Sequence, residues 1–267
     1  MATFRKGTNL IKEQAERKGG STRFTPNIYW NDGDIRTLVF LTPADDIPKV
    51  RLHQMVRIPD DRFERGFRYE SFLCRKDPSM VSESGGECEL CDTIGHDAQE
   101  RFVALAMELE PIKEGKRVAG LSVKYNKVAR DNGEEVEYPR WGLVVQGAKN
   151  FYSWLAAYDE SQQAITDVAF EIHREGDSIG TKYHFFPLMA PLPDMTEVLE
   201  NVPELEELLA QMGSDEKYEA LAEVEPGSQP TFGKGNNRET VSPATANSGG
   251  GTDRRALFDQ IKEQVTS

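Results

Sequence analysis

Hydrophobic and polar residues alternate along much of the middle of the chain, with the two-residue period of β-strands. In one such stretch Phe67, Tyr69 and Leu73 fall on one side, while Arg68 and Glu70 fall on the other. The same reasoning predicts strands at 36–42, 49–57, 67–73, 103–109, 117–128, 136–146, 168–174 and 181–187. Turn-forming residues at 131–133 and 176–177 are expected to join the last four of these strands into two hairpins.

A helical period replaces the alternation in only a few places. Residues 148–158 carry Phe151, Trp154, Leu155 and Tyr158 at helical spacing, which predicts one amphipathic helix. Further helices are expected at 9–18, at 194–212 with an end at Gly213, and at 253–267, where Leu257, Phe258, Ile261 and Val265 share a face. Many short strands and few helices predict a mainly β (α+β) fold, a small barrel or sandwich.

Charge divides the 267-residue chain into unequal parts. The net charge is −13, yet residues 1–24 carry six Lys/Arg and two Glu, and residues 194–225 carry 11 acidic groups and one Lys. Residues 1–193 together carry 26 basic and 30 acidic residues and are nearly balanced. We therefore expect a basic N-terminal arm (1–24), a core (25–193) and an acidic segment (194–225). A flexible linker rich in Gly, Ser and Asn (226–252) and an amphipathic C-terminal segment (253–267) are expected to follow.

Composition narrows the class of protein. Hydrophobic residues make up 38% and mean hydropathy is −0.58, with no apolar run of the ~18 residues that a membrane span needs. The N-terminus lacks the apolar stretch of a signal peptide, and three cysteines do not make a disulfide framework. We expect a soluble, cytoplasmic protein without membrane contact.

All three cysteines lie in one 18-residue stretch, as Cys74, Cys88 and Cys91. Two thiolates spaced as Cys-x2-Cys can grip one ion from a single turn, and thiolates with one imidazole suit tetrahedral zinc. His53, on a predicted strand, is the preferred fourth ligand, and His96 is the alternative. A closed set of three Cys and one His leaves no position for water, so one structural Zn²⁺ is expected.

Two other interpretations of the cysteines are weaker. They could be ordinary small core residues, but chance rarely confines every cysteine of a chain to one loop. A redox Cys-x2-Cys usually begins a helix in a βαβ unit, and no such unit is predicted here.

Basic residues are interleaved with aromatic ones in two stretches, 49–76 and 113–141. Single-stranded nucleic acids are held by this mixture, because cations follow the backbone while rings stack on bases without reading sequence. The candidate contacts are Arg51, Arg57, Arg62, Arg65, Arg68, Tyr69, Arg75, Lys76, Lys124, Tyr125, Lys127, Tyr138, Arg140 and Trp141. The alternative is a solvated β face above core aromatics. Tyr69 and Tyr125 are the favoured stacking residues, whereas Phe63 and Phe72 are expected in the core.

The order of these motifs resembles the zinc-containing helix-destabilising (single-stranded-DNA-binding) protein of T-even bacteriophages. The resemblance spans residues 4–187 in motif order: the basic Phe4-Arg5-Lys6 with Thr8, the 39–43 strand and proline, then His53, Cys74, Cys88 and Cys91, and finally 138–145, 149–157 and 168–173. One departure is Gly7, which separates the basic pair from Thr8.

The resemblance implies an oligonucleotide-binding (OB) barrel with an inserted zinc subdomain, at about residues 50–100. It also implies self-association along DNA through Arg5 and Lys6, and recruitment of replication and recombination proteins through the acidic C-terminal region. The function implied is coating of single-stranded DNA in phage replication, recombination and repair, in the host cytoplasm.

Enzymatic activity has little support in the sequence. Phosphate-binding glycine loops, dinucleotide motifs, HExxH and GxSxG are absent. The pairs Asp32–Asp34 and Asp45–Asp46 lie in turn-like contexts, where turn formation explains them. Two other functions remain open: a zinc-ribbon protein-interaction or transcription-regulating factor that does not bind single strands, and a primase-like or nuclease component.

Overall fold

A computed structural model describes most of the central part of the chain. The described residues are 27–61, 63, 66–79, 86–115, 117–129, 135–147, 151–176 and 181–224. They all belong to the first of two compact units, residues 1–232. The second unit, 233–267, and the expected arm at 1–24 lie outside the described residues, as does most of the expected linker.

Strands dominate the described part, as the alternating pattern predicts. Ten strands are present: β1 (Ile35–Phe40), β2 (Lys49–Pro59), β3 (Phe67–Leu73), β4 (Gln99–Glu114), β5 (Arg117–Val123), β6 (Tyr125–Ala129), β7 (Glu135–Pro139), β8 (Trp141–Gln146), β9 (Ala169–Glu175) and β10 (Lys182–Leu188). Eight form one antiparallel sheet in the order β10-β9-β1-β4-β2-β3, with β5 and β8 also paired to β4. Both predicted hairpins are confirmed, as the pairs β6–β7 and β9–β10.

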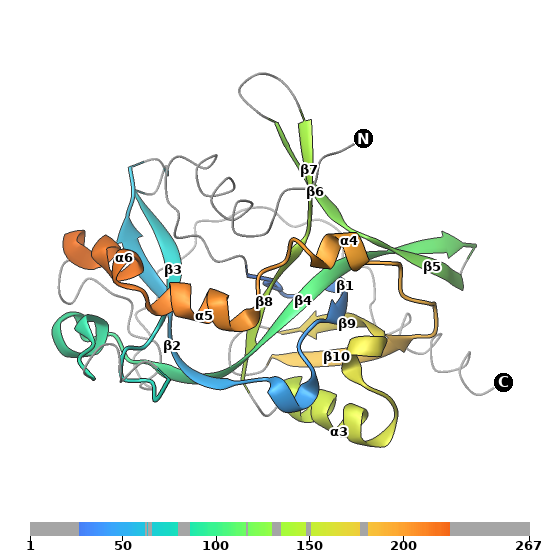
Figure 1. Cartoon of the computed structure of the whole chain (residues 1–267), viewed down its shortest axis with the longest axis horizontal. Coiled ribbons are helices and arrows are strands. Elements are labelled where there is room, and N and C mark those ends of the chain that lie inside the picture. The colour runs from blue at the N-terminus through green and yellow to red at the C-terminus, as the bar shows by residue number, and fades with distance from the viewer. Residues whose placement is uncertain are drawn as a thin grey trace, which may run out of the picture. The chain divides into compact units, whose positions relative to one another are not determined.

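The long strand β4 is the centre of this sheet (Figure 1). It pairs with β2 and then β1 through 99–102 and 106–109, and with β8 and then β5 through 102–107 and 109–114. The path ends at β10 and β3, and no ladder among the described strands joins these two ends. The expectation of a mainly β fold is therefore confirmed, but a closed barrel is not found in the described part of the chain.

Hydrophobic side chains project from both faces of the sheet, and each face packs against other elements of the chain. On β4, Val103, Leu105 and Met107 point to one core, and Ala104 and Ala106 to another. The second core is closed by α3 (Ser153–Ser161), together with the two residues before it, Phe151 and Tyr152. The first is closed by helices of the acidic segment, which lie across the opposite face (Figure 1).

Helices are few and short, and none in the described residues is long and apolar enough to span a bilayer. Besides α3 they are α4 (Thr196–Leu199), α5 (Leu205–Gly213) and α6 (Asp215–Tyr218), with 3-10 turns η1 (Ala44–Asp46), η4 (Ile165–Asp167) and η6 (Glu219–Glu223) and the π-turn η2 (Leu90–Ile94). The single helix expected over 194–212 is divided in two. Pro203 disfavours helical backbone at Val202, and the Asn201 side chain donates to the Glu197 carbonyl at 2.9 Å, ending α4.

The acidic segment is part of the folded body up to residue 224. Val198, Leu205, Leu208 and Met212 are buried in the first core, although acidic residues surround them in sequence. Farther on, Tyr218, Leu221 and Val224 pack with the cysteines in a third core. The acidic segment therefore packs against the folded body as far as residue 224.

Candidate metal centre and nucleic-acid interface

Four side chains from three parts of the chain converge in the third core. His53 lies on β2, Cys74 follows β3, Cys88 lies two residues before η2, and Cys91 lies within η2. Their ligand atoms all lie within 4.8 Å of one another, and His53, Cys74 and Cys88 are buried. These four residues are therefore close enough to bind one metal ion.

The separations fit a tetrahedral ion. The Sγ atom of Cys74 lies 3.9 Å from that of Cys88 and 3.7 Å from that of Cys91. The Nε2 atom of His53 lies 3.4 Å and 3.6 Å from the same two sulfurs. A tetrahedron with Zn–S bonds of ~2.3 Å and Zn–N bonds of ~2.05 Å has edges of about 3.8 Å and 3.6 Å. The sulfurs are too far apart for a disulfide, whose bond is about 2.05 Å.

Local structure holds the Cys-x2-Cys pair in this position. The Asp92 carboxylate accepts from the Cys88 backbone N–H at 3.1 Å, and the Asp92 N–H donates to the Cys88 carbonyl at 2.8 Å. Gly95 ends the turn with φ of 76°, and the next N–H, that of His96, donates to Leu90 at 2.7 Å. Only a glycine adopts that φ readily, so a glycine at this position favours the tight turn.

A β-bulge in β2 sets the direction of His53. The register shifts between His53 and Val56, and Met55 has a left-handed backbone with φ of 58°. Leu52 points to the first core and His53 to the third. The extra residue in the bulge then places Val56 and Ile58 on the same side as His53. The bulge thus lets one strand supply a ligand and also pack around the metal centre.

His96, the alternative fourth ligand, lies behind His53. The two Nδ1 atoms are 3.4 Å apart, while the Nε2 atom of His53 faces the sulfurs. A metal-bound imidazole commonly uses its second nitrogen to hydrogen-bond an outer residue, which fixes its orientation. The geometry therefore places His53 in the ligand set and His96 behind it. Burial, followed by the charge of His53, lowers the pKa of His96.

The cluster needs a cation if all three cysteines are to ionise. The hydrogen bond from Cys74 lowers the pKa of the Cys88 thiol, with a smaller contribution from His53. Burial raises the pKa of Cys91, and the neighbouring Cys88 raises it further. Ionisation of the Cys88 thiol is therefore favoured, whereas ionisation of the Cys91 thiol beside it is opposed. A bound divalent cation removes that opposition, so the donor set fits a metal that prefers thiolates.

The acidic segment covers the metal centre. The Tyr218 hydroxyl donates to the Leu73 carbonyl at 2.8 Å and lies 3.6 Å from the Cys88 sulfur. The Arg75 guanidinium stacks on the Tyr218 ring at 4.1 Å. Lys217 is buried beside them and forms an ion pair with Glu70. The metal centre is thus completed by residues more than 100 positions away in the sequence.

One face of the β2–β3 pair combines aromatic rings with a cation. Tyr69 and Phe67 alternate along this face with ring centroids 5.3 Å apart, and the Arg57 guanidinium lies 3.8 Å from the Phe67 ring. Tyr29, which is 54% exposed, interacts with the side chain of Ser71 on the same strand. We call Tyr29, Arg57, Phe67 and Tyr69 the aromatic strip.

Other predicted DNA contacts, on β2 and β3 and just after β3, are engaged within the fold. Arg68 forms ion pairs with Asp60 and Glu70, and Arg75 with Asp215. Lys76 contacts Asp92 at 2.5 Å and lies close to the metal centre. Arg51 uses its backbone N–H to bond Asp77, and its side chain is half-buried. These predicted DNA contacts therefore have structural partners, and their role in DNA binding stays a prediction.

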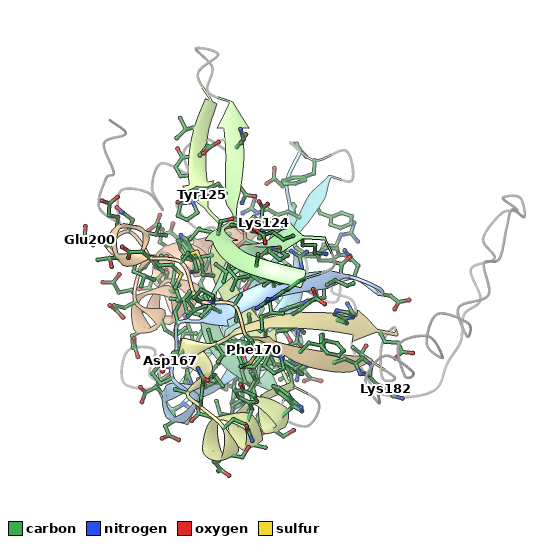
Figure 2. The ribbon with its side chains drawn as sticks, turned by 90° about the vertical axis from the view of Figure 1, so that its right-hand side faces the viewer. Lys124, Tyr125, Asp167, Phe170, Lys182 and Glu200 are labelled. Atoms are coloured by element: carbon green, nitrogen blue, oxygen red, sulfur yellow. The ribbon has the colours of Figure 1, made fainter. Side chains whose placement is uncertain are left out.

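The second predicted cluster surrounds a buried carboxylate. Lys124 and Arg140 both contact Glu108, whereas Lys127 pairs with Glu137 on the β6–β7 hairpin. Lys124 and Tyr125 lie at the base of that hairpin (Figure 2), and Tyr125 is 38% exposed.

Tyr138 and Trp141 are 4% and 8% exposed, so their rings pack inside the described structure rather than on its surface. The expectation for Phe72 is confirmed, because it is fully buried. Phe63 was expected in the core and is instead 49% exposed.

Some predicted residues lie outside the described residues: Arg5, Lys6, Arg62 and Arg65. Sequence patterns missed others that the fold brings to these sites: Tyr29, Arg36, Glu108, Lys217 and Tyr218. One of them carried a signal, since Lys217 is the single basic residue in the acidic stretch 194–225. A lone cation among acids is a reasonable candidate for a buried pair.

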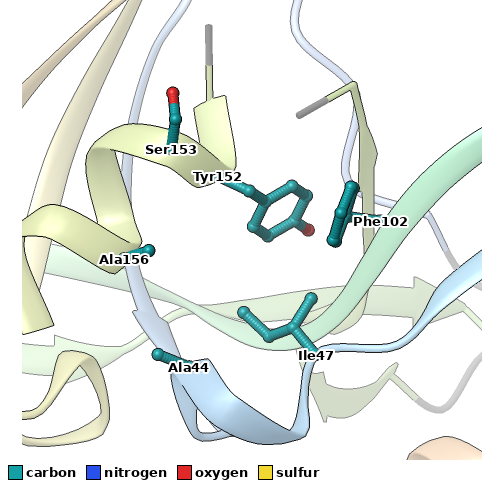
Figure 3. A pocket seen from close by; sticks show the side chains of 6 residues that line it. All are labelled: Ala44, Ile47, Phe102, Tyr152, Ser153 and Ala156. Atoms are coloured by element: carbon teal, nitrogen blue, oxygen red, sulfur yellow. The ribbon is translucent and has the colours of Figure 1, made fainter. Parts of the chain in front are cut away.

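An apolar pocket of about 220 Å³ lies between η1, β4 and α3. Ala44, Ile47, Phe102, Tyr152, Ser153 and Ala156 line it, with the rings of Tyr152 and Phe102 adjacent at one end (Figure 3). The Tyr152 hydroxyl donates to the Val144 carbonyl at 2.6 Å. The pocket shares no residue with the metal centre or with the predicted DNA contacts.

Asp32 and Asp34, considered as a metal pair, are engaged in the fold, Asp34 within a turn and Asp32 by a residue 144 positions away. Asp34 accepts from the Asn31 N–H at 2.8 Å, and Asp32 accepts from the Gly176 N–H at 2.7 Å. Within the described residues, the His53 and cysteine group is the cluster with metal-binding spacing. Comparison of the chain with protein-family models, with curated proteins and with solved structures gives no match.

Proposed function

We propose that this protein binds single-stranded DNA through a surface stabilised by a structural zinc ion. The observation that carries the proposal is the aromatic strip, where the exposed rings of Tyr29 and Tyr69 lie with Phe67 and the Arg57 cation along the β2–β3 pair. Rings stack on any base, and each stacked base contributes about 1–3 kcal/mol. Arg57 supplies a charge for the backbone next to the rings. This combination supports binding with little sequence preference.

Zinc is the metal that the donor set favours. Three sulfurs and one imidazole nitrogen at tetrahedral spacing form a closed site, which is typical of structural zinc. When bound, zinc joins β2, β3 and the 86–96 turn into one unit. Because β3 also carries the aromatic strip, loss of zinc is expected to disturb DNA binding as well as the local fold.

The biological role follows from binding to unpaired strands. A protein that binds single strands and not duplex removes hairpins by mass action on the unpaired state. Such a protein protects the strands exposed in replication, recombination and repair. Self-association through Arg5 and Lys6, and contact of the acidic C-terminal region with replication proteins, are further parts of the proposal; both rest on the family resemblance and on charge.

Fluorescence titration with a poly-dT oligonucleotide and a matched duplex tests the proposal. We expect binding to poly-dT and to mixed-sequence single strands with similar affinity, and much weaker binding to duplex. Equal affinity for duplex, or no binding to any single strand at low salt, would contradict it. The second result would favour a zinc-ribbon interaction factor whose basic surface contacts protein.

A further inference from the structure

Three cations surround one buried carboxylate in the centre of the sheet. Glu108, on β4, is buried, and both of its oxygens are engaged. Arg36 contacts them at 3.1–3.2 Å, Lys124 at 2.9 Å and Arg140 at 2.7 Å. The three cations come from β1, from the β5–β6 junction and from the β7–β8 junction.

The carboxylate does not neutralise this cluster. Asp34 is a second acid near it, 3.5 Å from Arg36, so three positive charges face two negative ones. Arg140 contacts Glu108 through Nε, which leaves the two terminal amino groups of its guanidinium outside this contact. Lys124 and Arg140 keep about a third of their side-chain surface exposed. Each can therefore hold Glu108 and still offer N–H donors to a second anion.

The surroundings favour a nucleic-acid backbone as that anion. Tyr125 follows Lys124 directly and is exposed. On the other side, Arg36 lies 6.0 Å from the ring of Trp30, the residue after Tyr29 of the aromatic strip. A strand that stacks on the strip would bring its phosphates toward this cluster, and an arginine fork binds phosphate oxygens well.

We propose that Lys124 and Arg140 bind backbone phosphate and that Glu108 is a positioning residue which holds both of them for that contact. This inference rests on the proposed function and names the residues that meet the charged part of its ligand. Long cationic side chains lose rotamer entropy when they bind, and a partner that already fixes them reduces that loss. The negative charge of Glu108 by itself repels a polyanion. Its contribution to binding is therefore the positioning of Lys124 and Arg140.

Substitution of the exposed cations is the first test. Lys124→Gln and Arg140→Gln should each weaken binding to a short fluorescein-labelled dT oligonucleotide about tenfold at low salt. Each should also lower the slope of log affinity against log salt by about 0.7. The matched control is Lys182→Gln, which removes an exposed lysine of β10 well away from Lys124 (Figure 2). A dT strand with neutral methylphosphonate links should bind more weakly and lose the difference between the variants.

Glu108→Gln separates positioning from charge. If only net charge matters, this change should tighten binding, because it removes a negative charge. If Glu108 positions the cations, binding should weaken and the response to Lys124→Gln should shrink in the double variant. Thermal melting and zinc content confirm that the variant folds. If Glu108→Gln does not fold, Arg140→Lys is tested in its place. This change keeps the positive charge and removes the guanidinium fork. Weaker binding then supports the proposal, and unchanged binding opposes it.

The outcomes separate this inference from the proposed function. If the unmodified protein does not bind dT strands, the proposed function fails and the inference with it. If it binds, but Lys124→Gln and Arg140→Gln behave like Lys182→Gln, the inference alone is wrong.

Discussion

The carboxylate of Asp215 lies 2.5 Å from the guanidinium of Arg75, although 140 positions separate them. Arg75 is a predicted DNA contact, and Asp215 belongs to the acidic segment. The same Arg75 stacks on Tyr218, so two residues of that segment hold it. An acidic residue is therefore already paired with a cation that, in the proposed function, would bind a DNA phosphate.

Asp215→Asn is expected to tighten binding to single strands. The pair is exposed on the aspartate side, and such pairs contribute only about 0.2–1 kcal/mol, so the gain should be about fivefold or less. It should fade as salt rises, because salt screens both the pair and the DNA contact. Fluorescence titration at several salt concentrations measures this.

The control for that change is Glu206→Gln, which removes one exposed acid of α5 at a different point of the same segment. The same gain from both variants would mean that only the overall charge of the segment matters.

Removing a ring from the aromatic strip should weaken binding without unfolding the protein. Tyr69→Ala and Tyr29→Ala should each reduce the binding free energy by about 1–3 kcal/mol, whereas Tyr69→Phe should retain most of it. Phe186→Ala is the control, since Phe186 is a ring of similar exposure on β10. Equal losses from Tyr69→Ala and Phe186→Ala would remove the strip from the binding surface.

Metal content should depend on His53 more than on His96. His53→Ala removes a ligand, so the purified protein should hold much less zinc than the one ion per chain expected. His96→Ala removes only the residue behind the ligand, for which a loss of about 10–100-fold in affinity is typical. Metal analysis during titration with a chelator measures both.

Cys88→Ser with Cys91→Ser should abolish zinc binding and loosen the residues near the site. A result in which His96→Ala is the more damaging histidine change would move the fourth ligand to His96.

Truncation after residue 224 should leave a folded protein, whereas truncation after Pro193 should not. The shorter form loses several buried side chains, among them Leu208, Met212 and Tyr218. Each contributes about 1.5–3 kcal/mol, and together they approach the 5–15 kcal/mol that stabilises a typical domain. Thermal melting of the two forms checks this.

A shorter form that melts at the same temperature as the longer one would make the acidic segment an independent tail. Because truncation after Pro193 is expected to unfold the protein, the effect of the acidic segment on DNA affinity is measured with Asp215→Asn instead.

Local patterns predicted the strands well, because alternation reports which faces are buried. Strand β3 has the predicted limits, and the spacing of the three cysteines indicated their shared site before any fold was known. The arrangement of the sheet could not be predicted in the same way. Pairing of β4 with four other strands depends on contacts between distant residues, which alternation does not specify.

The same limit applies to the sites. The sequence favours His53 over His96 only because His53 lies on a predicted strand. In the fold, the β2 bulge and the packing of the two rings distinguish them. Glu108 carried no signal, because one acid in a strand resembles any exposed acid until its three cations are seen. Burial of Tyr138 and Trp141 likewise depends on the strands around them.

Because of the bulge at Met55, the sites that β2 supports depend more on the number of residues in this strand than on the side chain at position 55. Met55 is exposed, so many side chains fit there if they accept its left-handed backbone, as Gly or Asn does. Deleting it would restore regular alternation and turn every residue on one side of the deletion to the opposite face. Either His53 would leave the sulfurs, or Val56 and Ile58 would leave the third core and Arg57 would leave the aromatic strip. A one-residue deletion would thus disconnect the metal centre from the aromatic strip, whereas substitution of Met55 by Gly or Asn would spare both.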